Sequence, residues 1–79
     1  MDGSSSVVVG ELAAGALIGR HRAIDAQMLL VVAGQVVVTG DADTIELARG
    51  QVVLFDGGEE HETRAITAAT LVMFERRGS

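Results

Sequence analysis

The sequence has 79 residues, which gives room for one domain with a single hydrophobic core. Its net charge is −5 and its only aromatic residues are two phenylalanines, so it lacks the basic surface and stacking side chains with which proteins bind nucleic acids. It has no cysteine, which excludes disulfides and thiolate metal sites. Its N-terminal residues lead only into a run of three valines, which is too short for a signal sequence or a membrane span. We therefore expect a small cytoplasmic protein that binds neither nucleic acids nor membranes.

Short runs of β-branched and aliphatic residues recur along the chain, and breaks that contain glycine separate them. This rhythm is typical of an all-β sandwich or barrel. The runs, in chain order, lie at residues 7–9, 28–32, 36–39, 44–47, 52–55 and 71–74, and a further strand is expected near residues 17–23. A further strand is expected after Gly58, where His61, Thr63 and Ala65 would share one face of the strand.

Segment 11–17 is the one place where a helix competes with this interpretation, because it is rich in alanine and leucine. Gly15 and Gly19 interrupt it, and each glycine costs about 1 kcal/mol relative to alanine inside a helix. We therefore expect a loop that leads into a strand. The expected organisation is a disordered tail at residues 1–6, a single domain at residues 7–76 and a second tail at residues 77–79.

The first histidine lies in a stretch with regular spacing. Gly15 is followed after five residues by His21, then by Gln27, and six residues separate Gln27 from Gly34. Because side chains alternate along a strand, Gln27 would share its face with aliphatic residues. An amide among aliphatic side chains needs a partner, which a metal ion, a water molecule or a histidine N–H would supply.

The second histidine follows a comparable stretch. Gly50 is followed after five residues by Asp56, and then by Gly58 and His61 with two residues between them. The two stretches together resemble the paired motifs of the cupin superfamily. The first family motif consists, in order, of a glycine, a His-x-His pair, a glutamate and another glycine. The second family motif consists, in order, of a glycine, a proline, a further glycine and a histidine. The likeness extends from about residue 10 to residue 75.

Three positions depart from the family pattern. Ala23 stands in place of the second histidine of the first motif, Gln27 in place of its glutamate, and Asp56 in place of the proline of the second motif. The resemblance implies an all-β fold, a small antiparallel cupin-type β-barrel or jelly roll. It also implies an interior metal site made of His21, Gln27 and His61, from which the family carboxylate is missing.

The resemblance leaves the chemistry of this interior site open. Two imidazoles and an amide oxygen could hold a divalent ion such as zinc, nickel, manganese or iron, and Asp25 or Glu59 could supply a carboxylate from a loop. Alternatively, the histidines are neutral residues of the barrel interior, bonded to Gln27, Thr63 or buried water.

Three functions are therefore expected. The first is an enzyme that acts on a small polar molecule, either with a weakly held divalent metal or with His61 as the catalytic base. The second is a non-catalytic ligand-binding or sensory module, and the third is a purely structural barrel that dimerises. In each case we expect a homodimer, because cupins commonly pair through sheet edges and the strand at residues 7–9 would expose such an edge.

Overall fold

A computed structural model describes residues 5–22 and 26–76, and within these ranges every regular element is a β-strand. The strands are β1 (Ser5–Leu12), β2 (Leu17–Arg22), β3 (Gln27–Ala33), β4 (Gln35–Thr39), β5 (Thr44–Ala48), β6 (Val52–Phe55), β7 (Glu60–Ala65) and β8 (Ala69–Arg76). Each predicted apolar run lies largely within one of these strands. Segment 11–17 holds the end of β1, a turn and the start of β2, as expected for a loop rather than a helix.

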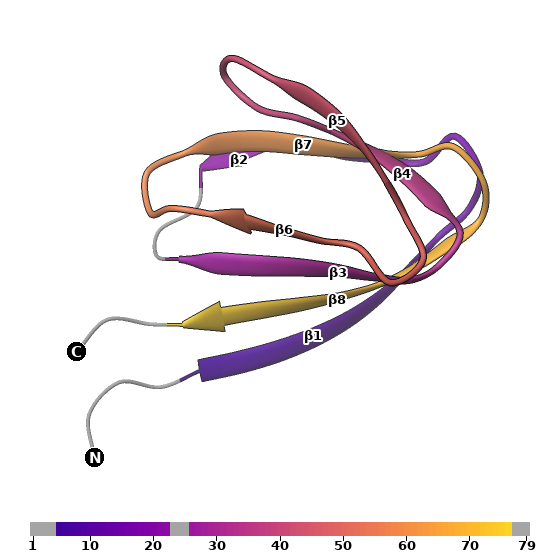
Figure 1. The fold of residues 1–79 in the computed structure, drawn as a ribbon, viewed down its shortest axis with the longest axis horizontal. Helices are drawn as coiled ribbons and strands as arrows, with labels where there is room; N and C mark the ends of the chain where they lie inside the picture. Colours follow the sequence, from indigo (N-terminus) through magenta and orange to yellow (C-terminus); the bar gives the residue numbers. More distant parts are fainter. Residues whose placement is uncertain (1–4, 23–25, 77–79) are drawn as a thin grey trace.

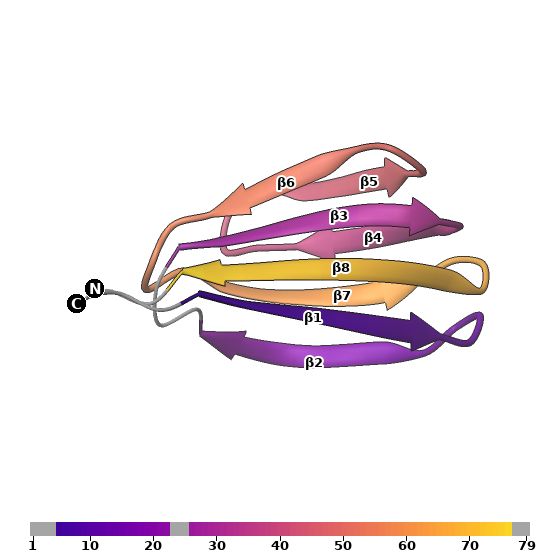
Figure 2. The same cartoon turned by 90° about the horizontal axis from the view of Figure 1, so that it is seen from below.

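The strands form two antiparallel four-stranded sheets that face each other (Figure 1). The order is β1-β8-β3-β6 in the first sheet, here called sheet A, and β2-β7-β4-β5 in the second, here called sheet B. Figure 2 shows each strand of sheet A stacked on one of sheet B, with β1 on β2, β8 on β7, β3 on β4 and β6 on β5. This arrangement confirms the predicted all-β jelly roll.

The two sheets do not close into one barrel, which corrects the expectation of a closed sheet. Each sheet keeps two edge strands, β1 and β6 in sheet A and β2 and β5 in sheet B. The molecule is therefore an open sandwich, held by packing between the sheets. The first strand also starts at Ser5, inside the segment expected to be a tail, because residues 5 and 6 pair with β8.

The core fills the space between the sheets. Alternate residues of facing strands supply it, since one face of each strand points inward. The buried hydrophobic residues are Leu29, Val31, Val36, Val38, Leu47, Phe55, Ala65, Ala69 and Leu71. The buried polar residues among the described side chains are Gln27, His61 and Thr63, so the interior is apolar except at a few defined positions.

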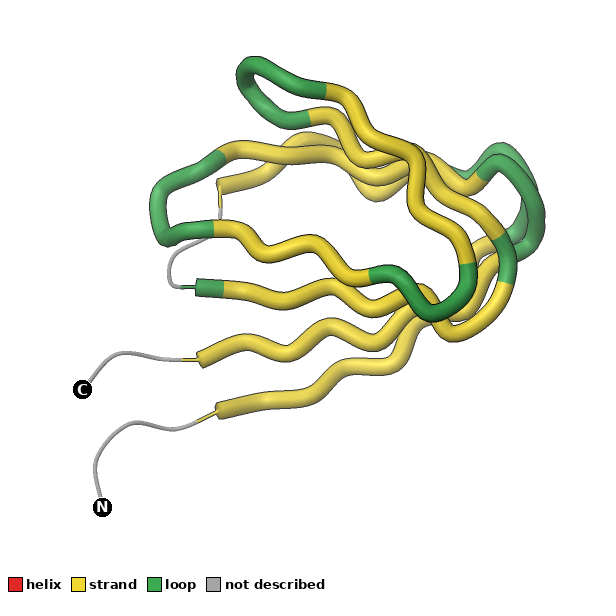
Figure 3. The backbone as a smooth tube through the Cα atoms, in the orientation of Figure 1, coloured by secondary structure: helices red, strands yellow, loops and turns green. Residues whose placement is uncertain are grey.

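The two ends of the sandwich differ. Short turns close one end, while the start of β1, the end of β8 and the β6–β7 loop lie at the other (Figure 3). Gly34 forms the tight turn between β3 and β4 with φ of 85°, and a Cβ there would collide with the Ala68 carbonyl and lie 2.7 Å from the Ala69 Cα. Glycine is therefore required at this closed end, which fixes the register of β3 against its neighbours.

In the described ranges, the chain has no helix with the length and apolar character needed to cross a membrane.

Candidate functional site

The strand register sets the two histidines opposite each other. In the pairing of β2 with β7, the Cα of His21 is the partner of the Cα of His61, next to an irregularity between Ile18 and His21. The His61 side chain is 1% exposed. It shares the inner face of β7 with Thr63 and Ala65, which is the alternation expected from the sequence. The register therefore brings the backbones of both predicted histidines to the same end of the sandwich.

Gln27 lies at this end on the facing sheet. It is the first residue of β3, it pairs with Phe55 of β6 on one side and Glu75 of β8 on the other, and its side chain is 9% exposed. Its Nε2 donates a hydrogen bond to Glu75 Oε2 at 2.8 Å. The amide oxygen Oε1 is buried and has no hydrogen-bond partner among the residues that the structure describes.

The chemistry of Glu75 fixes the orientation of this amide. A carboxylate only accepts hydrogen bonds, so the NH₂ group of Gln27 has to face Glu75, and the carbonyl oxygen is turned away from it. The result is a buried acceptor that presents its lone pairs to the interior. Native proteins rarely leave such an atom without a partner.

Phe55 connects Gln27 to His61. Its backbone pairs with that of Gln27, and its ring stacks on the His61 imidazole with centroids 3.8 Å apart and an interplanar angle of 8°. The stacked ring covers one face of the imidazole, whereas the lone pair of an imidazole nitrogen lies in the ring plane. Stacking therefore orients His61 without covering the ring edge that binds metals or protons.

Gln27 also lines a cleft between the sheets. This cleft has a volume of about 250 Å³, and the other described residues that line it are apolar or glycine. They are Val8, Gly10, Leu12, Ile18, Leu29, Leu71 and Met73. Among the side chains that the structure describes, which do not include that of His21, the amide is thus the single polar one along this apolar cleft.

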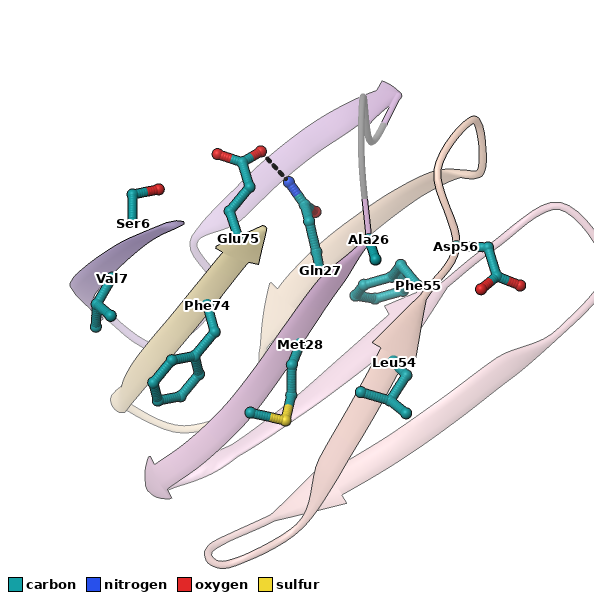
Figure 4. A pocket seen from close by; sticks show the side chains of 10 residues that line it. All are labelled: Ser6, Val7, Ala26, Gln27, Met28, Leu54, Phe55, Asp56, Phe74 and Glu75. Atoms are coloured by element: carbon teal, nitrogen blue, oxygen red, sulfur yellow. Dashed lines mark hydrogen bonds between the residues drawn. The ribbon is translucent and has the colours of Figure 1, made fainter. Parts of the chain in front are cut away.

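A second pocket, of about 310 Å³, lies where β1, β8, β3 and β6 meet the open end. Figure 4 shows the Gln27–Glu75 hydrogen bond on one side of sheet A, with Phe74 and Met28 pointing to the other side. This pocket borders both the candidate site and the outer surface of sheet A.

Glu75 is the site residue that sequence reasoning missed. The sequence predicts a metal site without a carboxylate, whereas the structure sets Glu75 beside Gln27. Of the two alternatives considered, Asp25 lies outside the described residues, and Glu59 is used in the β6–β7 turn, where its Oε1 accepts a hydrogen bond from the Asp56 backbone N–H at 2.6 Å. The alternation of Leu71, Met73 and Glu75 along β8 is the signal that could have placed this carboxylate inside.

The candidate metal ligands do not form the usual set of three histidine or carboxylate side chains that holds a catalytic metal ion. Among the side chains that the structure describes, which do not include that of His21, no three of histidine, aspartate or glutamate gather closely enough to hold an ion. A metal at this end would therefore depend on the Gln27 amide oxygen as well as on histidines. The buried oxygen without a partner is compatible with that role, since amide oxygens do bind divalent cations.

Comparison with known proteins places the chain among relatives of the same architecture. Residues 8–75 match the family described as the cupin domain, while no curated protein matches the chain. A conserved protein of unknown function from Streptococcus pyogenes superimposes with a TM-score of 0.87 at 25% identity, over 95% of this chain and 65% of that one. The match therefore covers less than two thirds of the length of that relative.

Two further structures agree in fold. A cupin superfamily protein from Desulfitobacterium hafniense has a TM-score of 0.85 at 14% identity, over 94% of this chain and 76% of that one. A variant of oxalate decarboxylase from B. subtilis has a TM-score of 0.87 at 22% identity, over 95% of this chain and 22% of that one. Since the family pattern spans most of the sequence and the jelly roll agrees with these structures, the chain belongs to the cupin domain family.

Proposed function

We propose that this chain is a small-molecule-binding cupin domain whose ligand donates a hydrogen bond to Gln27 inside the sandwich. The observation that carries the proposal is the buried Oε1 atom of Gln27, which has no partner within the described part of the chain. Leaving such an acceptor unsatisfied costs about 1–3 kcal/mol. A bound ligand with an N–H or O–H group at this place would remove that cost.

The surroundings of Gln27 define the class of ligand. Glu75 is a second hydrogen-bond acceptor next to the amide, so an alcohol, an amine or an amide N–H suits the site, whereas the oxygens of an anionic ligand do not. The apolar lining of the cleft suits a hydrocarbon body. Its volume of about 250 Å³ lies near the lower limit for ligand pockets, which favours a molecule of few heavy atoms.

A binding screen tests this proposal. Thermal unfolding of the chain would be followed with small alcohols, amines and amides, each compared with an ether or ketone of the same shape that has no donor. A ligand at about 100 times its dissociation constant adds about 2.7 kcal/mol of stability. We expect donors to stabilise the chain, their donor-free analogues to have no effect, and Gln27→Met to abolish the difference. Equal stabilisation of Gln27→Met by the same donors would contradict the proposal.

A second candidate is a divalent metal site, favoured by the register that sets His21 opposite His61. The ion would be held by the two histidines and the Gln27 carbonyl, ligands that suit zinc, nickel, manganese or iron. When bound, it would supply Lewis-acid chemistry to a small polar substrate, and His61 would act as the base that accepts a proton. This is the version of the function in which the chain is an enzyme.

Elemental analysis separates the two candidates. The chain would be purified without a histidine tag, equilibrated with each of the four metals and analysed, with His61→Ala as the comparison. We expect the metal candidate to give close to one bound ion per chain that His61→Ala loses. Absence of metal from both samples would eliminate it and leave the donor-binding site, which requires no metal.

A further inference from the structure

Gly10 is an unexpected residue for its place in β1. It lies inside the strand, between Val8 and Leu12, and all three residues line the apolar cleft of about 250 Å³ that also contains Gln27. Glycine weakens the interior of a strand, because it packs no side chain and loses more conformational freedom on folding than any other residue. A glycine at such a position therefore has to serve another purpose.

The structure excludes the usual backbone reasons for a glycine at position 10. The pairing of β1 with β8 runs from Ser5 to Leu12 without a shift of register, so there is no bulge at Gly10. The φ angle of Gly10 is not positive, whereas four other glycines of the described chain have φ of 82–92°. A Cβ at this position would meet no heavy atom of a non-adjacent described residue within 4 Å, so no other segment passes close by. Among the roles that glycine has inside strands, close approach of a ligand is the one that remains.

The missing side chain leaves open space in the wall of the cleft, here called the Gly10 hollow. β1 and β2 lie one over the other along this edge of the sandwich (Figure 2), and Ile18 of β2 lines the cleft opposite β1. Val8 also lines the cleft, yet it is 59% exposed, so the chain does not cover this apolar wall itself. Burying a polar group against such a wall without a hydrogen bond is costly, and the hollow therefore suits a hydrocarbon group.

The Gly10 hollow and Gln27 lie at different ends of the cleft. Gly10 pairs with Leu71 of β8, Gln27 pairs with Glu75 four residues along the same strand, and β8 separates β1 from β3. With about 3.3 Å per residue and about 4.8 Å between strands, the two Cα atoms are on the order of 15 Å apart. The side chain of Gln27 spans part of this distance. A volume of about 250 Å³ stretched over such a length makes a narrow channel, which suits an unbranched chain better than a ring.

We propose that the ligand of this cleft is a hydrogen-bond donor group on an unbranched hydrocarbon chain, and that Gly10 sets how long this chain can be. The donor bonds to the Gln27 carbonyl, and the end of the hydrocarbon chain lies in the Gly10 hollow. Primary alcohols and primary amines have this chemistry. The donor end of this assignment rests on the function proposed above, whereas the hydrocarbon end rests on Gly10.

NMR titration of the wild-type chain with primary alcohols from ethanol to octanol tests the two ends separately. Each added methylene should tighten binding about fourfold, until the alcohol is long enough to reach Gly10 and the gain stops. The side-chain NH₂ resonances of Gln27 should shift with every alcohol, whereas the backbone N–H resonance of Gly10 should shift only with the longer ones. A Gly10 resonance that ethanol and octanol shift equally, or that neither shifts, would overturn the proposal.

Filling the hollow should shorten the accepted chain. Gly10→Val should weaken the binding of octanol at least about tenfold, which corresponds to two lost methylene contacts, and should leave the binding of ethanol within about twofold. Without ligand, this variant should unfold at a higher urea concentration than the wild type, since valine favours strands and no atom stands in its way. Gly10→Ala should show a smaller effect in the same direction, and it serves as the test if the valine variant does not fold.

Gly19→Val is the matched control. Gly19 also lies in a strand, and a Cβ there would meet open space, but it is not among the described residues that line the cleft. This variant should bind every alcohol as the wild type does. If Gly19→Val and Gly10→Val weaken octanol binding equally, the effect is not specific to the hollow and the proposal is wrong.

The outcomes separate this proposal from the function proposed for Gln27. If alcohols depend on Gln27 but Gly10→Val binds octanol as tightly as the wild type, Gly10 sets no limit, and only the proposal on Gly10 fails. If methyl ethers of the same length bind as tightly as alcohols, and Gly10→Val still excludes the long ones, the hydrocarbon end is supported and the donor site at Gln27 is wrong. Alcohols that fail to bind at any length would contradict both.

Discussion

Replacing Gln27 by methionine tests the unsatisfied amide directly. Methionine has a similar length and shape, so the change removes the polar atoms with little change of volume. The buried carbonyl without a partner costs about 1–3 kcal/mol, and its removal stabilises the chain by that amount. The hydrogen bond to Glu75 is lost as well, and a bond to a charged group contributes about 1.5–3 kcal/mol when it is fully buried. Because Glu75 is only partly buried, water can replace part of that bond.

The two effects nearly cancel. We expect the free energy of unfolding of Gln27→Met to lie within about 1 kcal/mol of the wild type, in a chain whose total stability is about 4–12 kcal/mol for its length. Urea unfolding followed by far-UV circular dichroism measures it, since the chain has neither tryptophan nor tyrosine. Leu29→Ala, two residues along the same buried face, is the control and should lose about 3 kcal/mol or more. If Gln27→Met loses as much as Leu29→Ala, the amide is fully satisfied in the native state, and the reasoning that places a ligand there is wrong.

Three further changes test other parts of the structure. Gly34→Ala should lower the free energy of unfolding by at least about 3 kcal/mol, because a Cβ collides with the backbone of Ala68 and Ala69 and the φ of 85° is unfavourable for alanine. Gly50→Ala is the control, since Gly50 has a similar φ of 87° but open space around it. It should lose only about 1–2 kcal/mol, measured by urea unfolding. Equal losses would contradict the collision. Gln27→Glu should lower the unfolding free energy of the metal-free chain, because it sets two carboxylates side by side. Added zinc or nickel should restore the stability of this variant. A urea midpoint that neither metal raises would contradict the metal candidate. Phe55→Leu should lower the unfolding free energy by about 1 kcal/mol through loss of the stack on His61, and an unchanged midpoint would show that the stack contributes nothing.

Most of the fold is readable from the sequence, because its signals are local. Valine-rich runs and glycine-bearing breaks identify the strands, and alternation correctly assigns Leu29, Val31 and Thr63 to the interior. The length of β1 and the open edges are not readable in this way. Ser5 joins β1 because it pairs with residue 76, and this contact spans nearly the whole chain.

The candidate site is only partly readable, for the same reason. His61 and Gln27 stand out by their residue types and spacing, and the structure sets both against Phe55. Glu75 follows an apolar run near the end of the chain and resembles a solvated terminal residue in the sequence alone. Its role depends on the register of β3 with β8, which joins residues 48 positions apart.

Two of the residues that depart from the family pattern make new hydrogen bonds with nearby side chains. These bonds argue against a site that has simply lost its functional residues. Asp56 replaces a proline, which has no N–H, and the N–H that it adds donates to Glu59. Gln27 replaces a glutamate, and it lies within hydrogen-bond distance of the Glu75 carboxylate. A glutamate at position 27 would set two negative charges against each other, so the amide is the residue that this neighbour favours. This end of the sandwich thus has one carboxylate, as in the family pattern, but on β8 instead of the neighbouring strand β3. In addition, it has the Gln27 carbonyl, which can accept a hydrogen bond. This exchange supports the proposed binding of hydrogen-bond donors, because two acceptors, the Glu75 carboxylate and the Gln27 carbonyl, lie close together there.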